Sequence, residues 1–165
     1  MPASIRSETP KDYPAIAEIN ANGGVAGHPV ELIMADDAGV PATSVSAMNK
    51  LVFQDKVDFL IGGNISSTVL AHMQISEKEG IPYIVTTASN AQITTKANKW
   101  TVRLHQNDLT QAVQLADFVL NVIKKTKIAV MFDTGDYGTG CKNAFNDQLS
   151  KIGYQPLITV GFNTG

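Results

Sequence analysis

Apolar and polar positions follow two alternating periods along almost the whole chain. Segments with apolar residues three or four positions apart predict helices, and short apolar runs between them predict strands. Gly80 and Gly153 follow predicted helices as stop signals, whereas Pro10 and Pro41 stand at predicted helix starts. Strands that alternate with helices of about ten to fifteen residues are typical of a parallel sheet covered on both faces. The pattern therefore predicts an α/β fold with a doubly wound parallel sheet.

The expected elements follow one another in regular order. Helices are expected over 10–22, 41–52, 67–79, 108–123 and 139–152, and strands over 30–34, 57–61, 81–85, 100–104, 127–132 and 155–162. Asp108 and Gln111 have the spacing of a capping box at the start of the fourth helix. The expected buried stripe of that helix consists of Leu109, Val113, Ala116, Leu120 and Ile123. The polar stretch 104–107 is the expected boundary between two parts of the chain, 1–105 and 106–165.

Composition narrows the class of protein. The chain has 165 residues, 44% of them hydrophobic and 17% charged, which is typical of a globular domain rather than a disordered one. A formal net charge of −2 argues against nucleic acid or an anionic membrane as the main partner. No apolar stretch approaches the length of a membrane-spanning helix. The N-terminal residues also lack the apolar core of a secretory signal, so we expect either a cytoplasmic protein or a signal that this chain does not include.

Two loops at the ends of predicted strands are rich in groups that bind small polar ligands. The first runs through Gly62, Gly63, Asn64 and Ile65 to Ser66, and the second contains Thr87, Ala88 and Ser89. In open α/β sheets ligands bind beyond the carboxyl ends of the strands, and free amides at a helix start suit an anion. The alternative for the serine is an ordinary helix cap, and for the second loop a solvated turn. Neighbouring strands would place both loops at one edge of the sheet, which favours a shared pocket.

Catalytic, metal and cofactor motifs are poorly represented. The chain contains neither G-x-G-x-x-G nor a phosphate-binding P-loop, and no serine stands in a G-x-S-x-G elbow, so we expect no nucleotide cofactor and no catalytic residue. His72 falls inside a predicted helix and is expected to point away from the serines. Asp36 and Asp37 lack further ligands nearby, so no metal site is expected. Cys141, alone in the chain, is expected to serve packing.

Several of these stretches resemble one family. Residues 19–32, Asp36 to Gly39, Gly62 with Ser66 and Ser67, residues 79–82, Arg103, and Asp133 with 136–138 are similar, in order and spacing, to the leucine/isoleucine/valine-type substrate-binding proteins of ABC transporters. The resemblance extends over about residues 15 to 162. It implies two α/β lobes that close over a ligand, a type I periplasmic-binding fold, no enzymatic activity, and a periplasmic or extracellular location. It also implies an amino-acid-like ligand and a membrane permease as partners.

The resemblance also implies roles for single residues. Ser66 matches the serine that holds the ligand's α-carboxylate. Thr87 matches a residue that binds through its carbonyl, and Ser89 one that binds through its hydroxyl and amide. Ala88, Asn64 and Ile65 complete the two loops, and Tyr137 matches an aromatic residue of the second lobe that closes over the ligand. Tyr137 would otherwise be taken for an exposed turn residue.

Some family features are missing or altered. The first strand is not recognisable in residues 1–9, most of the second lobe has no counterpart, and Gly63 stands where proline is frequent. We therefore expect a fragment, with most of lobe one in 1–105 and the opening of lobe two in 106–165. Two alternatives remain open: a ligand-sensing domain of a receptor or regulator with the same fold, and an enzyme of flavodoxin-like or hydrolase type.

Overall fold

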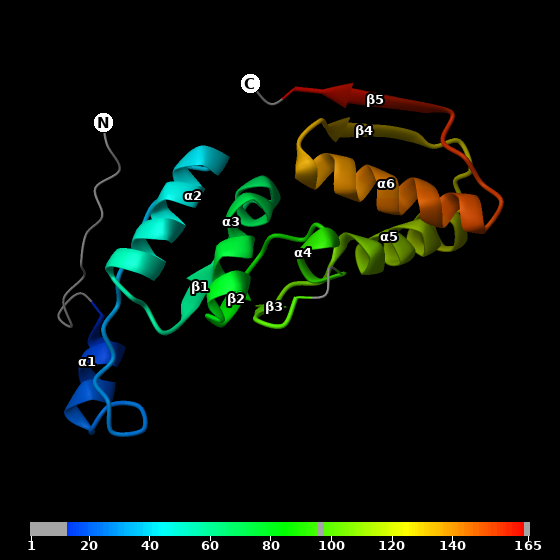
Figure 1. The fold of residues 1–165 in the computed structure, drawn as a ribbon. Helices are drawn as coiled ribbons and strands as arrows, with labels where there is room; N and C mark the ends of the chain where they lie inside the picture. Colours follow the sequence, from blue (N-terminus) through cyan, green and yellow to red (C-terminus); the bar gives the residue numbers. More distant parts are fainter. Residues whose placement is uncertain (1–12, 96–97, 164–165) are drawn as a thin grey trace. The chain divides into compact units, whose positions relative to one another are not determined.

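A computed structural model describes residues 13–95 and 98–163 (Figure 1). The chain forms two compact units, which divide between Val57 and Asp58. This division into compact units does not test the predicted lobe boundary near residue 105, which remains a prediction. None of the helices in the described segments is both long and apolar enough to cross a membrane.

The described part of the first unit, residues 13–57, is largely helical. It contains α1 (Pro14–Ala21), α2 (Pro41–Asn49) and a π-helical continuation, η1 (Lys50–Gln54). Pro14 occupies the first turn of α1. Pro10, which was expected to open this helix, lies outside the described residues.

The strand expected over 30–34 is not formed. Within this segment, the side chain of Asn20 bonds to the backbone of Val30. Its Nδ2 donates to the Val30 carbonyl at 2.8 Å, and its Oδ1 accepts from the Val30 N–H at 2.7 Å. A strand needs a second backbone as partner along its length. The Asn20 side chain bonds to the backbone of Val30 alone, and Ile33 forms only an isolated bridge, so no continuous strand results.

The second unit begins with a three-stranded parallel sheet in the order β1-β2-β3. Its strands are short, and each begins one to three residues later than expected. The elements of this part are β1 (Leu60–Gly62), α3 (Ser66–Glu79), β2 (Tyr83–Val85), α4 (Gln92–Thr95) and β3 (Thr101–Arg103). Gly80 ends α3 with φ +73°, as its place in the sequence predicts. The short helix α4 was not predicted.

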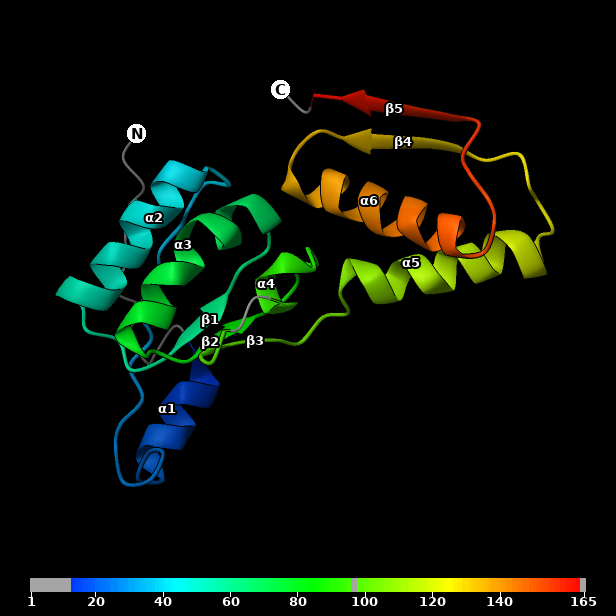
Figure 2. The same ribbon diagram turned by 45° about the vertical axis from the view of Figure 1, so that its right-hand side comes forward.

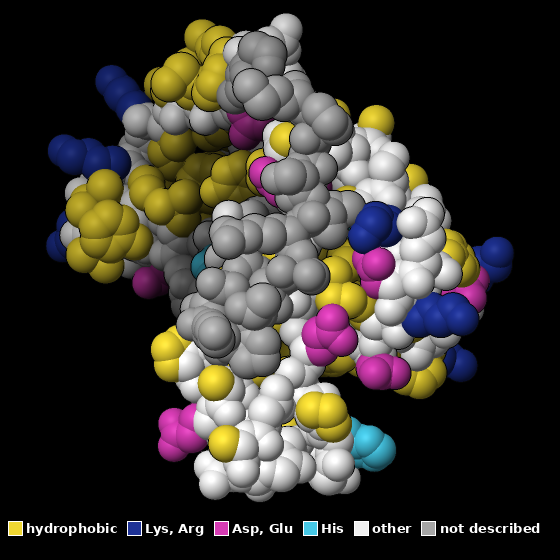
Figure 3. Space-filling model, turned by 90° about the vertical axis from the view of Figure 1, so that its left-hand side faces the viewer, with side chains coloured by type: hydrophobic (Ala, Val, Ile, Leu, Met, Phe, Trp, Pro, Cys, Tyr) yellow, Lys and Arg dark blue, Asp and Glu magenta, His cyan; other side chains and the backbone are white. Residues whose placement is uncertain are grey.

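The two faces of this sheet differ. Leu60, Tyr83 and Thr101 lie in register and are buried on the face that also carries Val85; Val85 and, in α3, Val69 and Met73 are fully buried. Ile61 and Val102 belong to the opposite face and are 61% and 53% exposed. Within the second unit, α3 covers the face that carries Tyr83 and Val85. Exposed apolar side chains are frequent, and Figure 3 shows them in yellow gathered in patches.

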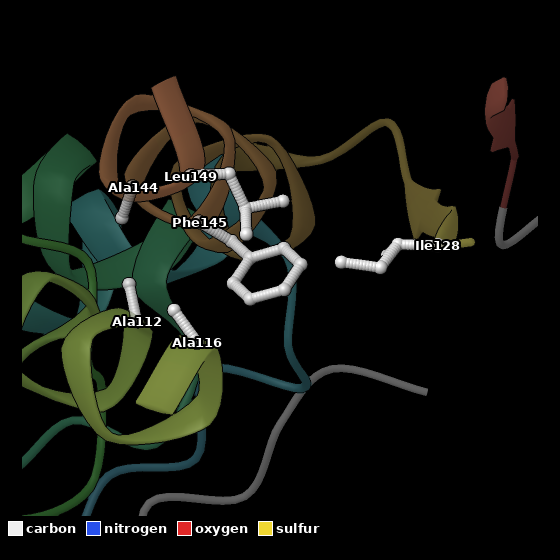
Figure 4. Packing of buried hydrophobic residues seen from close by; sticks show 6 residues of the cluster. All are labelled: Ala112, Ala116, Ile128, Ala144, Phe145 and Leu149. Carbon is white, nitrogen blue, oxygen red and sulfur yellow. The ribbon is translucent and has the colours of Figure 1, made fainter. Parts of the chain in front are cut away.

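The rest of the second unit also alternates helices with parallel strands (Figure 2). It contains α5 (Asp108–Asp117), a π-helical turn η2 (Phe118–Val122), β4 (Ala129–Asp133), α6 (Asp136–Lys151) and β5 (Ile158–Phe162). The strands β4 and β5 are parallel, and α5 packs along α6. Figure 4 shows Phe145 and Leu149 of α6 pointing towards Ile128, with Ala112 and Ala116 of α5 facing them.

One expectation for α5 is wrong, and a second is right only in part. Its cap is Asn107, whose Oδ1 accepts the Thr110 N–H at 2.9 Å, so the capping motif begins one residue earlier than Asp108. Leu109 and Val113 are about half exposed, while Ala112 and Ala116 are buried. Ala116 and Leu120 of the expected stripe do belong to this core, whereas Leu109 and Val113 do not, because the small alanines allow the close approach of α6.

Candidate ligand site at the ends of β1 and β2

The first candidate loop leaves the carboxyl end of β1. Gly63 has φ +83°, a left-handed conformation that favours glycine, and a Cβ there would lie 2.7 Å from Val69 Cγ2. The chain thus turns closely above the sheet before entering α3. Ser66 is the first residue of that helix and 1% exposed, and the cap position belongs to Ile65, which makes no side-chain cap bond. Ser66 therefore does not act as the helix cap that the sequence left open as an alternative.

The second loop, after β2, is bonded directly to the first. The Thr86 N–H donates to the Gly62 carbonyl at 2.8 Å, and the Ala88 N–H donates to the Gly63 carbonyl at 3.1 Å. At the outer side of the pair, the Thr87 hydroxyl contacts the Asn64 side chain. The two loops therefore form one structure at the edge of the sheet.

The serines lie in the inner part of this structure. The Asn90 N–H donates to Ser66 Oγ at 3.3 Å, and the adjacent Ser89 is 3% exposed. In contrast, Asn64, Ile65 and Thr87 are exposed, and Ala88 is buried. A serine hydroxyl at the start of a 14-residue helix, next to buried backbone amides, is the kind of environment that binds an anionic group.

Tyr137 lies in the first turn of α6 and lines a separate hollow of about 630 Å³. None of the other candidate residues lines that hollow. Its wall includes His105, Asp108, Phe118 and Cys141. This region is linked to the loops: Asn90 Nδ2 donates to the Asp136 carbonyl at 2.7 Å, next to Tyr137 in the chain, and the Asp108 N–H donates to the Ser89 carbonyl at 3.0 Å. The start of α6 is thus tied to the loop that follows β2.

The groups around Tyr137 are mostly acidic. The nearby Cys141, burial, and the carboxylates of Asp108 and Asp133 raise the pKa of Tyr137. Burial, together with Asp108, raises the pKa of the Cys141 thiol to about 12. Its Sγ donates to Asp108 Oδ1 at 3.4 Å. Neither the phenol nor the thiol is therefore activated as a nucleophile, because a raised pKa keeps each protonated.

The residues considered for catalysis or metal binding have structural contacts. His72 Nε2 lies 3.0 Å from the Tyr83 hydroxyl inside the protein, so its side chain belongs to the core. Asp36 and Asp37 accept the N–H groups of Ala38 and Gly39 within a turn. Among the described residues, no group of three or more histidines, cysteines or carboxylates could hold a metal ion.

Sequence reasoning gave Asn90 no role, although it bonds to Ser66, Asp136 and Gln92. Asn90 stands at the end of a polar run after a strand, and that was the only signal available. Arg103 was noted only for its resemblance to the family, yet its guanidinium binds the same loop. Both residues act over distances in sequence that spacing rules do not cover.

Parallel α/β layers with polar loops at the carboxyl ends of the strands define a class of small-molecule-binding proteins. Comparison with known proteins identifies the family. The profile of the family described as periplasmic binding protein matches residues 14–165, and the chain belongs to this family. It is an α/β protein with the fold of that family.

Relatives agree with this assignment. The chain is 34% identical over 151 residues to an amino acid binding protein of Pseudomonas aeruginosa, and these residues make up 92% of this chain and 40% of the relative. It is 33% identical to the Leu/Ile/Val-binding protein of Escherichia coli K12, with 92% of this chain and 41% of the relative covered. The chain thus spans about two fifths of the length of the curated relatives it matches.

Solved structures give the same result. A leucine-binding protein of Thermotoga maritima has a TM-score of 0.80 and 25% identity, covering 91% of this chain and 43% of the other. The branched-chain amino acid transporter substrate-binding protein of Streptococcus pneumoniae, solved with isoleucine, has a TM-score of 0.79 and 25% identity. The latter covers 92% of this chain and 42% of the other.

Proposed function

We propose that this protein is the solute-binding component of an ABC transporter and that it binds a branched-chain amino acid without transforming it. One observation carries the proposal. The loops after β1 and β2 meet so that Ser66 and the 87–90 segment lie together, with the Asn90 N–H on Ser66 Oγ at 3.3 Å. The names of relatives that bind leucine, isoleucine and valine support the choice of ligand.

Each residue has a distinct task in this proposal. The Ser66 hydroxyl and the hydroxyl and amide of Ser89 hold the α-carboxylate, and the Thr87 carbonyl accepts from the α-ammonium. Asn64, Ile65 and Ala88 shape the loops around them. Tyr137 closes over the ligand from the side of α6, to which Asn90 is tied. The loaded protein delivers its ligand to a membrane permease from the periplasm or the outer cell surface.

Calorimetric titration of the intact protein with L-leucine, L-isoleucine and L-valine tests the proposal. A hydrogen bond to a charged group contributes about 1.5–3 kcal/mol, so Ser66→Ala should weaken binding roughly ten- to hundredfold. Ser67→Ala, a change of the same size at the next residue, is the matched control and should leave affinity unchanged. Absence of binding by the wild type would refute the ligand class. Equal affinities for the wild type and Ser66→Ala would refute the role of Ser66.

A further inference from the structure

The guanidinium of Arg103 holds the loop that carries Thr87 and Ser89. Arg103 is the last residue of β3 and lies beside Val85, the last residue of β2. Its Nη1 donates to the Ala88 carbonyl at 3.3 Å and to the Asn90 carbonyl at 2.8 Å, and its Nη2 donates to Thr94 Oγ1 at 2.7 Å. Two backbone carbonyls of the ligand loop are thus bound by one side chain from the neighbouring strand.

Because the peptide bond is planar, these hydrogen bonds also fix the direction of the Ser89 N–H. In a planar trans peptide, the carbonyl of one residue and the N–H of the next point in opposite directions. The Ala88 carbonyl faces Arg103, so the Ser89 N–H faces away from it. Within residues 13–95 and 98–163 that N–H has no hydrogen-bond partner, although Ser89 is 3% exposed. A buried and unpaired amide is costly unless a ligand accepts from it.

The next peptide is fixed from both sides. The Ser89 carbonyl accepts from the Asp108 N–H at 3.0 Å. The Asn90 N–H belongs to the same peptide, points in the opposite direction and donates to Ser66 Oγ. Because these bonds hold residue 90, the hydrogen bond from Arg103 to the Ala88 carbonyl decides the orientation of the peptide between Ala88 and Ser89. The free amide therefore stands next to the amide that already contacts Ser66.

Arginine suits this task better than lysine. Its planar fork carries five N–H donors in fixed directions, whereas the three donors of a lysine ammonium all radiate from one nitrogen and lack this planar arrangement. The guanidinium donates to three acceptors of the protein, two from the loop and one from α4. Burial lowers the pKa of Arg103, an effect that the nearby Asp108 carboxylate opposes.

We propose that Arg103 is a positioning residue of the ligand site, which presents the Ser89 amide to the ligand's carboxylate by holding the Ala88 and Asn90 carbonyls. This inference rests on the proposed function, because it assumes a carboxylate ligand at Ser66 and Ser89. It assigns Arg103 no direct contact with that ligand.

The first test uses two probes, L-leucine and L-leucinol, which lacks the carboxylate. In the intact protein, Arg103→Met should weaken L-leucine binding roughly ten- to hundredfold, and Arg103→Lys should restore part of the loss. Neither change should alter the weaker binding of L-leucinol. Lys151→Met, which removes an exposed cation at the end of α6, is the control and should match the wild type. Equal losses for both probes would overturn the proposal, since they would indicate general damage to the fold.

The second test needs no ligand. In protein labelled with ¹⁵N-serine, Arg103→Met should shift the Ser89 amide resonance, and Lys151→Met should not. Arg103→Lys, the milder variant, should give a smaller shift and serves if Arg103→Met fails to fold. An unchanged Ser89 resonance in both arginine variants would overturn the positioning role, whatever the protein binds. If Arg103→Met shifts the Ser89 resonance but the wild-type protein does not bind L-leucine, the positioning role is supported and the proposed ligand is refuted.

Discussion

The N–H of Asn90 donates to Ser66 Oγ at 3.3 Å and thereby joins the ends of two neighbouring parallel strands. Since this bond occupies a lone pair of the hydroxyl oxygen, the hydroxyl proton remains available for donation to an acceptor. A carboxylate accepts hydrogen bonds and does not donate them, so the arrangement suits a carboxylate ligand. The bond uses the backbone of Asn90 and leaves its side chain for a second task.

That second task leads to a first prediction. Asn90 Nδ2 donates to the Asp136 carbonyl, so Asn90→Ala should lower the free energy of unfolding by about 1–2 kcal/mol through the loss of this part-buried bond. Asn90→Asp should cost more, because a carboxylate oxygen would face that carbonyl. Urea unfolding measures both. The control is Asn121→Ala, whose side chain makes an exposed bond to Asp117 and whose loss should change little. Equal effects at both sites would contradict this tie between loop and helix.

Gly63 and Gly153 provide a second, matched prediction. Both have nearly the same left-handed φ, +83° and +82°, so an alanine at either position carries similar backbone strain, about 1–2 kcal/mol. Only at Gly63 would the added Cβ also clash, with Val69 Cγ2 at 2.7 Å and the Tyr83 hydroxyl at 2.5 Å.

Overpacking of this kind adds about 1–3 kcal/mol. Gly63→Ala should therefore destabilise the protein more than Gly153→Ala in thermal or urea unfolding, and it alone should weaken amino acid binding. A smaller effect at Gly63 than at Gly153 would show that the first loop is less closely packed above the sheet than described.

Glu77 gives a prediction about pH. Its carboxylate accepts the N–H groups of Lys99, Trp100 and Thr101 at 2.7–2.9 Å. Burial by itself raises the pKa of Glu77, but these hydrogen bonds outweigh burial, so the pKa lies below its ordinary value of 4.5. A lowered pKa in the folded state means that the carboxylate contributes stability above pH 4.5. This contribution is lost as the pH falls through the lower folded-state pKa.

Glu77→Gln should remove this acid dependence and lower stability at pH 7 by about 1–2 kcal/mol, because water replaces part of the lost bonding. Urea unfolding between pH 3 and pH 7 provides the measurement. Glu79→Gln, at an exposed position in the same helix, is the control and should retain the dependence. Parallel pH profiles for the wild type and Glu77→Gln would exclude this account.

Cys141 should react slowly with alkylating reagents. Burial is the largest cause of its raised pKa, about 12, and the Asp108 carboxylate is the next. Iodoacetamide should therefore label the folded protein at pH 8 much more slowly than the same protein in urea, because the thiolate is the reactive form. Asp108→Asn should speed labelling of the folded state. The folded-state pKa exceeds the ordinary value of 9, so the thiol's contribution to stability is lost between about pH 9 and pH 12. Labelling of the folded and unfolded protein at equal rates would contradict the burial of this group.

The sequence predicted what depends on neighbouring residues. Gly80 and Gly153 end their helices in the left-handed conformation, as expected, because only glycine adopts it without a steric penalty. The parallel strands and the helices between them lie close to their predicted positions. The strand over 30–34 was wrong and the buried stripe of α5 was right only for Ala116 and Leu120, since each depends on which partner segment lies alongside.

For the candidate site, the sequence by itself determined that Ser66 and Ser89 follow strands, and the family resemblance assigned their roles. Tertiary structure decided that the two loops share hydrogen bonds, that Asn90 joins Ser66 to α6, and that Arg103 orients the loop after β2. The physical reason lies in separation along the chain. Bonds between residues 13 to 46 positions apart form only once the sheet has brought the strands together, and no local spacing encodes them.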